Sequence, residues 1–394
     1  MCMANDNKRF LPMGKQVMMG NIAMAEGALA GGLNFFAGYP ITPSTEVPEH
    51  LVSRLPECGG AFIQMEDELA SINAVLGASI AGAKAMTATS GPGTALMAET
   101  ISMGASLEIP FVICDVQRNG PGTGLVTAPH HNDVFQCKYS GNGEYEVIAY
   151  APMSCQELYD LTIEAFNAAE TYRCPTYIMS DAYLGHLHEP VVIAAADDVQ
   201  QRVVDRQFLD HANPEKFTFK DNQGNIMIPP APVLGTPNFP TYFFSQPHGS
   251  DGIPMNENQV IKPLSYLLDK ITNNVEKIAR TQSYMIDDAE IIIIAYGLPA
   301  RVSYRVVNMA RQAGIKAGLF RLVTLWPFPY EQVKQVLAEA KAVVVPEMNF
   351  GLMAGEVERA KRLDIPLYKV PKIAELHEPG EILAVIKKAA EVMA

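Results

Sequence analysis

The sequence predicts two α/β domains of unequal size, joined by a segment without regular structure. In the first half of the chain, short apolar runs alternate with segments of helical periodicity. The alternation returns around the run of four isoleucines at 291–294, which indicates a buried strand. Such alternation is typical of parallel sheets covered on both faces. We therefore expect a larger domain at 1–198, an irregular arm and helix at 199–275, and a smaller three-layer domain at 276–394.

The elements of the larger domain follow from local patterns. Alanine and methionine favour a helix at 14–30, Pro43-Ser44-Thr45 is a start signal for a helix at 46–55, and small residues recur in a helix at 68–83. Further helices are expected at 94–103 and 155–170. The expected strands are short apolar runs, at 33–37, 61–64, 85–89, 110–115, 146–149 and 176–180, and residues 191–193 are expected to trail away from the last one.

Residues 119–145 carry little periodic apolar character and are rich in glycine. Loops this long in compact domains are usually functional. This one holds the adjacent histidines His130 and His131, although loop histidines are more often solvated than catalytic.

Prolines and aromatic residues dominate 229–244, so residues 200–265 should be an irregular arm that packs against a domain or a partner. Alternating elements then resume. The expected helices are 262–287, 299–313, 330–339, 352–362 and 378–393, and the expected strands are 289–295, 317–322, 342–346 and 366–370.

The net charge and the cysteine pattern argue against several kinds of partner and site. A formal charge of −13 disfavours nucleic acid and anionic membranes as partners. No run of 18 apolar residues predicts a membrane helix, and the N-terminus lacks a signal-peptide layout. The six cysteines are scattered without a Cys-x-x-Cys pair, which predicts free thiols in the cytoplasm and no metal or iron–sulfur site built by this chain alone.

Four motifs follow predicted strands: Tyr39-Pro40-Ile41-Thr42-Pro43, Gln64-Met65-Glu66-Asp67-Glu68, Ser90-Gly91-Pro92-Gly93 and Val116-Gln117-Arg118. Two prolines stiffen the turn around Thr42, and glycines at 91 and 93 permit close approach of a ligand. An arginine at the carboxyl end of a strand can grip a carboxylate. The residues alone also permit purely structural roles. Thr42 could be a turn residue, the acid could complement the dipole of a helix N-terminus, and the arginine could lie on the surface.

Together, and in this order, these motifs resemble the α subunits of the 2-oxoacid:ferredoxin oxidoreductases, most closely the 2-oxoglutarate form (2-oxoglutarate synthase). The resemblance covers nearly the whole chain. It implies a pyrimidine-binding-type parallel-sheet domain of thiamine enzymes, followed by a domain like the C-terminal domain of transketolase.

The resemblance also implies roles for single residues. Glu68 would hydrogen-bond N1′ of the thiamine aminopyrimidine, with Glu66 as the fallback, and Thr42 and Arg118 would hold the oxo acid, Arg118 at its carboxylate. The remaining cofactor contacts would be Tyr39, Pro40, Ile41, Ser90, Gly91 and Pro92. A second substrate carboxylate would need donors such as His130 and His131. However, His131-Asn132-Asp133 replaces the familiar Gln, small residue, Asp, and Asn142 stands where relatives often carry His, so the substrate stays open.

The sequence lacks the Gly-Asp-Gly element that holds diphosphate and magnesium in thiamine enzymes, and it lacks a Walker-type loop. The resemblance thus implies half an active site. A β subunit would supply the half of the site that binds the diphosphate and Mg²⁺, and γ and ferredoxin-like δ subunits would complete the complex. Iron–sulfur clusters in the partner subunits would pass electrons to external ferredoxin. Coenzyme A would be a substrate. The alternatives are a branched-chain oxo acid (3-methyl-2-oxobutanoate) or pyruvate as substrate, and a non-catalytic assembly subunit. The missing phosphate loop disfavours a stand-alone nucleotide binder.

Overall fold

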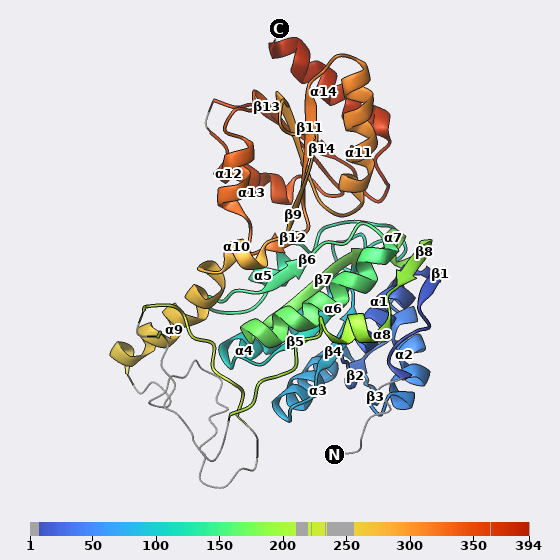
Figure 1. The fold of residues 1–394 in the computed structure, drawn as a ribbon, viewed down its shortest axis with the longest axis vertical. Helices are drawn as coiled ribbons and strands as arrows, with labels where there is room; N and C mark the ends of the chain where they lie inside the picture. Colours follow the sequence, from blue (N-terminus) through green and yellow to red (C-terminus); the bar gives the residue numbers. More distant parts are fainter. Residues whose placement is uncertain are drawn as a thin grey trace.

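Two sheets organise the residues that the computed structural model describes, which are 8–209, 220–221, 223–232, 234, 256–362 and 364–393. Figure 1 shows the larger sheet with its helices in the N-terminal half of the chain, and the smaller sheet in the C-terminal part. The parts of the arm prediction that fall on 210–219, 222, 233 and 235–255 lie outside the described residues.

The larger sheet has seven strands in the order β12-β6-β7-β5-β4-β2-β3, and all of them except β12 run parallel. Its strands are β2 (Phe35–Gly38), β3 (Ala61–Gln64), β4 (Ala85–Thr89), β5 (Phe111–Gln117), β6 (Ile148–Tyr150), β7 (Pro175–Asp181) and β12 (Thr324–Trp326). Every residue of β4, β5 and β7 is buried, as expected for a parallel sheet with both faces covered.

Alternate side chains of each strand enter two different cores. On β5, Val112 and Cys114 pack with α1 (Gly20–Ala30), α2 (Glu46–Glu57) and α6 (Cys155–Tyr172). Phe111 and Ile113 pack on the other face, where α3 (Glu68–Ile80) and α4 (Gly91–Ser106) lie. This second core continues into the smaller domain, so the two sheets share buried surface.

The smaller sheet has the order β14-β13-β10-β11-β9. Its elements are β9 (Thr281–Tyr284), β10 (Ile291–Ala295), α11 (Gly297–Gln312), β11 (Ala317–Leu322), α12 (Tyr330–Val336), β13 (Ala342–Glu347), α13 (Leu352–Ala360), β14 (Leu367–Pro371) and α14 (Pro379–Met393). Helices α11 and α14 cover one face, and α12 and α13 cover the other (Figure 1). The fold class predicted from the sequence is confirmed.

The prediction of one helix at 14–30 is wrong. Residues Gly14–Met19 form β1, which pairs antiparallel with β8 (His188–Ile193), and the helix begins at Gly20. The prediction that residues 191–193 trail away from the last strand is also wrong, because they belong to β8. Methionine and alanine favour helix locally, but pairing with a strand far away in sequence overrides that preference.

The helix predicted at 262–287 is also wrong in its second half. Helix α9 (Glu257–Thr272) begins inside the predicted arm and ends at Asn273-Asn274, followed by a short α10 (Val275–Ile278) and by β9, which pairs antiparallel with β11. Three short helices were not predicted: α5 (Gln136–Tyr139), inside the long loop, α7 (Ala182–His186) and α8 (Ala196–Gln200). The domain limits at 198 and 275 stay predictions, and β12 places residues 324–326 in the larger sheet.

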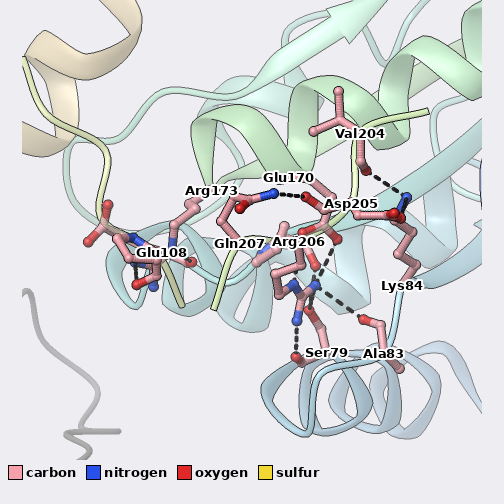
Figure 2. Close-up of polar contacts among 12 residues, drawn as sticks. Ser79, Ala83, Lys84, Glu108, Glu170, Arg173, Val204, Asp205, Arg206 and Gln207 are labelled. Carbon is pink, nitrogen blue, oxygen red and sulfur yellow. Dashed lines mark hydrogen bonds and ion pairs between the residues drawn. The ribbon is translucent and has the colours of Figure 1, made fainter. Parts of the chain in front are cut away.

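The start of the connecting arm is bound to the larger domain by a buried arginine. Arg206 donates from Nε and Nη2 to the carboxylate of Glu170, at 2.8 Å each, and from Nη1 and Nη2 to the carbonyl oxygens of Ser79 and Ala83 (Figure 2). A bidentate pair with its remaining donors satisfied is the geometry in which a buried ion pair is stable.

Two more cations bind the arm through backbone carbonyls. Lys84 Nζ donates to Val204 O at 2.7 Å, and Arg173 Nη1 donates to the carbonyls of Pro229 and Pro230. Lys84 directly precedes β4, and Arg173 lies just before β7, so the arm crosses the amino ends of the parallel strands. The carboxyl ends of these strands lie at the opposite edge of the sheet.

Among the described residues, no helix combines the length and apolarity that crossing a bilayer requires.

Candidate active site

The carboxyl ends of four neighbouring parallel strands deliver the four sequence motifs to one edge of the larger sheet. Strand β2 leads into the turn around Thr42, β3 leads toward Glu68, β4 leads into Ser90, and β5 leads into Arg118. Open α/β sheets bind ligands at this edge. The structure therefore brings together motifs that lie up to 76 residues apart.

Glu68 is the first residue of α3 and is only 5% exposed. Asp67 caps the helix by accepting a hydrogen bond from the Ala70 backbone N–H at 2.7 Å. Burial raises the pKa of the Glu68 carboxyl, Asp67 adds to the rise, and the Arg118 guanidinium opposes it. Glu66, by contrast, is exposed. The structure thus places a buried carboxyl with a raised pKa at Glu68 and not at the fallback position.

Gly93 makes the position of Glu68 possible. A Cβ atom at Gly93 would lie 2.6 Å from Glu68 Cγ and 2.7 Å from Glu68 Oε1. It would also lie 2.0 Å from Thr89 Oγ1. Any side chain at position 93 would therefore displace the carboxyl, which explains the second glycine of the Ser-Gly-Pro-Gly motif.

Arg118 and Thr42 are in direct contact. Arg118 Nη1 donates to the Thr42 carbonyl oxygen at 2.7 Å, and the Arg118 side chain is buried. Its Nε has no partner among the described residues. Asn21 holds the turn from behind, because its Nδ2 donates to Pro43 O at 2.8 Å and to Glu46 Oε2 at 2.7 Å. The Arg118 guanidinium is therefore oriented by the Thr42 turn and still has a donor without a partner among the described residues.

A cavity of about 590 Å³ opens beside Arg118. Its walls include Gly91, Pro92, Arg118, His130, Asp133 and Phe350. Of the predicted site residues, Arg118, Gly91, Pro92 and His130 line it. Tyr39, Pro40, Ile41, Thr42, Glu68, Ser90 and His131 do not line it, although all except His131 lie in the motifs at the same sheet edge.

The two histidines have different environments. The ring of His130 lies on the cavity wall, its Nδ1 is 3.1 Å from Asn119 Nδ2, and burial lowers its pKa, with a further contribution from His131. His131 points elsewhere: its Nε2 lies 3.0 Å from Asp181 Oδ2, and its ring stacks on Tyr296 with centroids 5.2 Å apart. Only His130 is placed to meet a ligand in the cavity.

Sequence reasoning missed two buried acids. Asp133 lines the cavity, and burial raises its pKa to about 7. Asp115 lies at the end of β5, and its pKa is raised well above the usual range by burial and by Asp133. One oxygen of each, Asp133 Oδ2 and Asp115 Oδ1, has no hydrogen-bond partner in the described chain. The signal for Asp115 was a carboxylate near the carboxyl end of a buried strand, close to Arg118, whereas Asp133 lies in the long loop after β5 and follows no strand directly.

The segment after β13 was also missed. Asn349, Phe350 and Leu352 reach the cavity from the smaller domain. Glu-Met-Asn-Phe-Gly at 347–351 follows a buried strand, so the same rule of strand ends applies to it.

The residues present fit the aminopyrimidine end of thiamine diphosphate. A buried carboxyl with a raised pKa lies at the same sheet edge as Ser90 Oγ and Arg118 Nε, two polar atoms that have no partner among the described residues. In the described part of the chain, no three His, Cys, Asp or Glu side chains are grouped to hold a metal ion.

Comparison with known proteins gives the family. Residues 26–261 match the model described as pyruvate flavodoxin/ferredoxin oxidoreductase, thiamine diphosphate-binding, and residues 289–375 match pyruvate:ferredoxin oxidoreductase core domain II. The chain is 42% identical to 2-oxoglutarate synthase subunit KorA of Methanocaldococcus jannaschii, over 93% of this chain and 98% of that one. It is 34% identical to ketoisovalerate oxidoreductase subunit VorB of Methanothermobacter marburgensis, over 88% of this chain and 90% of that one.

Comparison with solved structures gives the same family. A 2-oxoglutarate:ferredoxin oxidoreductase from Magnetococcus marinus, with 2-oxoglutarate, coenzyme A and succinyl-CoA bound, superposes with a TM-score of 0.87 at 31% identity. The match covers 96% of this chain and 66% of that one. A split-gene transketolase, at 13% identity and a TM-score of 0.57, shares the fold alone. The resemblance read from the motifs is confirmed, and the chain belongs to the pyruvate flavodoxin/ferredoxin oxidoreductase family, as a subunit with a thiamine diphosphate-binding domain.

Proposed function

We propose that this chain is the α subunit of a 2-oxoglutarate:ferredoxin oxidoreductase, which converts a 2-oxo acid and coenzyme A to acyl-CoA and CO₂ and passes two electrons to ferredoxin. The reverse, reductive carboxylation, uses the same site. One observation carries the proposal: Arg118, bound to the Thr42 turn, and the buried Glu68 meet at one sheet edge. They do so in a chain 42% identical to a 2-oxoglutarate synthase subunit.

Each residue has a distinct task. Thiamine diphosphate, when bound, supplies the electron sink for loss of CO₂. Glu68 holds a proton at the pyrimidine nitrogen, a role that a buried acid with a raised pKa can perform. Arg118 binds the carboxylate next to the oxo group, and Thr42 keeps Arg118 oriented through its carbonyl oxygen. The Thr42 hydroxyl is the group we assign to the oxo acid. The remaining residues that would hold the aminopyrimidine ring are Tyr39, Pro40, Ile41, Ser90, Gly91 and Pro92.

His130 is our candidate for the second carboxylate of 2-oxoglutarate. It lies on the wall of the cavity that also contains Arg118, burial lowers its pKa, and its ring N–H can donate to a carboxylate. In this proposal His131 has no contact with substrate.

Partner subunits complete the enzyme. We assign the diphosphate and Mg²⁺ to a β subunit, and the iron–sulfur clusters to partner chains that include γ and a ferredoxin-like δ, in a cytoplasmic complex. The support is chemical: the described residues here suit only one end of the cofactor.

The test is viologen-linked oxidation by the purified complex, with coenzyme A present, of 2-oxoglutarate, 3-methyl-2-oxobutanoate and pyruvate. Preference for 2-oxoglutarate is expected. Preference for 3-methyl-2-oxobutanoate would favour the second candidate, a branched-chain enzyme, to which the 34% identity with VorB points. No turnover of any oxo acid, in a complex that contains thiamine diphosphate and clusters, would leave only an assembly role.

His130→Gln tests the second carboxylate. We expect KM for 2-oxoglutarate to rise about tenfold, the cost of one lost donor to a charged group, while KM for pyruvate stays unchanged. His188→Gln, on the exposed face of β8, is the matched control.

A further inference from the structure

The smaller domain contributes a wall to the cavity. Strand β13 ends at Glu347 and helix α13 begins at Leu352, and the residues between them turn toward Arg118 and His130. Gly351 has φ of +94°, a left-handed conformation that favours glycine, and it turns the chain into α13. We call residues 348–351 the cavity loop.

Phe350 is the unusual member of this loop. Its side chain is 76% exposed, whereas Met348 and Asn349 are buried. An exposed phenylalanine on an outer surface needs no explanation, but this one borders the cavity that contains Arg118. Its ring is therefore apolar surface available to whatever the cavity binds.

Asn349 holds the loop with every hydrogen-bonding group of its amide. Its Nδ2 donates to His131 O at 2.8 Å and to Tyr296 Oη at 3.0 Å. Its Oδ1 accepts from the backbone N–H groups of Gly351 at 2.7 Å and Leu352 at 2.9 Å. The residue is 2% exposed, so these bonds are protected from water.

Glu347 extends the same network. Its carboxylate is fully buried and accepts hydrogen bonds from the Tyr296 hydroxyl at 3.0 Å and from the N–H groups of Met353 and Ala354 at 2.9 Å. These N–H groups belong to the first turn of α13, where a carboxylate is favoured by the helix dipole.

The network crosses to the larger domain through His131. Its backbone N–H donates to Met348 O at 2.8 Å, and its ring lies between Tyr296 and Asp181. His131 directly follows His130, so one set of buried bonds determines the relative positions of the cavity loop and of the candidate substrate donor.

We propose that Phe350 is a substrate contact and that Asn349 is the positioning residue which holds it in the cavity. The inference rests on the proposed function, because it assigns the oxo acid as the ligand. Phe350 packs against the carbon chain of the oxo acid, in the cavity that Arg118 also lines. The exposed Phe350 ring gains little from packing within the protein. The hydrogen bonds of Asn349 hold the loop that carries this ring, and they therefore preorganise it for binding.

The test uses the purified complex with Phe350→Ala, Phe350→Leu and Asn349→Ala, and measures kcat and KM separately for 2-oxoglutarate and for coenzyme A. Phe350→Ala should raise KM for 2-oxoglutarate about tenfold or more, the usual discrimination of an apolar pocket contact. Phe350→Leu restores apolar surface and should recover most of the affinity. Asn349→Ala should reproduce the KM effect of Phe350→Ala.

Asn308→Ala is the matched control for Asn349. It removes an Asn–Tyr hydrogen bond, from Tyr284 Oη to Asn308 Oδ1 at 2.9 Å, in the same domain but on the exposed face of α11. It should leave both KM values unchanged. If Asn349→Ala fails to fold, the Phe350 variants still decide the matter, since an exposed side chain contributes little to folding.

Wild-type turnover of 2-oxoglutarate with unchanged KM in Phe350→Ala would overturn the inference and leave the proposed function intact. A rise in KM for coenzyme A alone would also overturn it, because the ring would then contact the other substrate. Absence of turnover in the wild-type complex would instead refute the proposed function itself.

Discussion

Arg118 Nη1 lies 2.7 Å from the carbonyl oxygen of Thr42, across 76 residues of sequence. This hydrogen bond joins the end of β5 to the turn after β2 and determines the direction of the guanidinium. The bond uses one of its five N–H donors, and Nε has no partner among the described residues. The relationship explains why a stiff turn and a strand-end arginine occur in one chain.

Arg118→Lys should raise KM for the oxo acid by about 10- to 100-fold, because a hydrogen bond to a charged group contributes ~1.5–3 kcal/mol and lysine cannot form the bidentate pair. Steady-state kinetics on the complex measure this. Arg301→Lys, in a half-exposed pair with Glu189 away from the cavity, should have no effect. Equal loss in both variants would contradict a specific role.

Glu68→Gln should lower kcat by about 100-fold or more, the usual contribution of a positioned acid or base, with the complex still assembled on size-exclusion chromatography. Glu66→Gln, two residues away and exposed, is the control and should retain activity. Full turnover in Glu68→Gln would favour the assembly role over the catalytic one.

Asp133→Asn should change how stability depends on pH. Burial raises the pKa of Asp133 from 3.8 to about 7, so the folded chain holds the proton more tightly than the unfolded chain does. The folded state is therefore penalised as pH rises through this interval, and the penalty is complete above about pH 7.

The unfolding midpoint of Asp133→Asn should match that of the wild type near pH 4 and exceed it at pH 8. Differential scanning fluorimetry across this range measures the difference. Asp198→Asn, in the exposed first turn of α8, should show no such divergence. A variant that loses stability at pH 8 would show that the Asp133 carboxylate is stabilising.

Arg206→Ala should destabilise the larger domain by ~3–5 kcal/mol, because it leaves the buried carboxylate of Glu170 without its partner. Denaturant unfolding measures this loss, and limited proteolysis should cut near 203–209 sooner than in the wild type. KM should not change, since the arm crosses the sheet edge opposite the cavity. Lys334→Ala, which breaks the exposed pair with Glu331, is the control for a surface charge.

The parallel core and the location of the site were accessible from the sequence. Strands β2 to β5 have short apolar runs with clear boundaries, and residues at the carboxyl ends of adjacent parallel strands must converge. That rule singled out Arg118, whereas Thr42 and Glu68 were identified by the family motifs. The same rule applies to Asn349, just after β13, which the motif comparison did not identify.

Local sequence was enough to predict the alternation of helices and strands, the family motifs and the approximate ends of the strands, because these features depend on local periodicity and residue type. The tertiary structure decided what depends on distant partners. It decided that Gly14–Met19 is a strand, through pairing with β8. It also decided that His130 faces the cavity while His131 faces Tyr296 and Asp181, and that the smaller domain supplies Phe350. Pairing between segments far apart in the sequence leaves no local pattern, so only the folded chain reveals it.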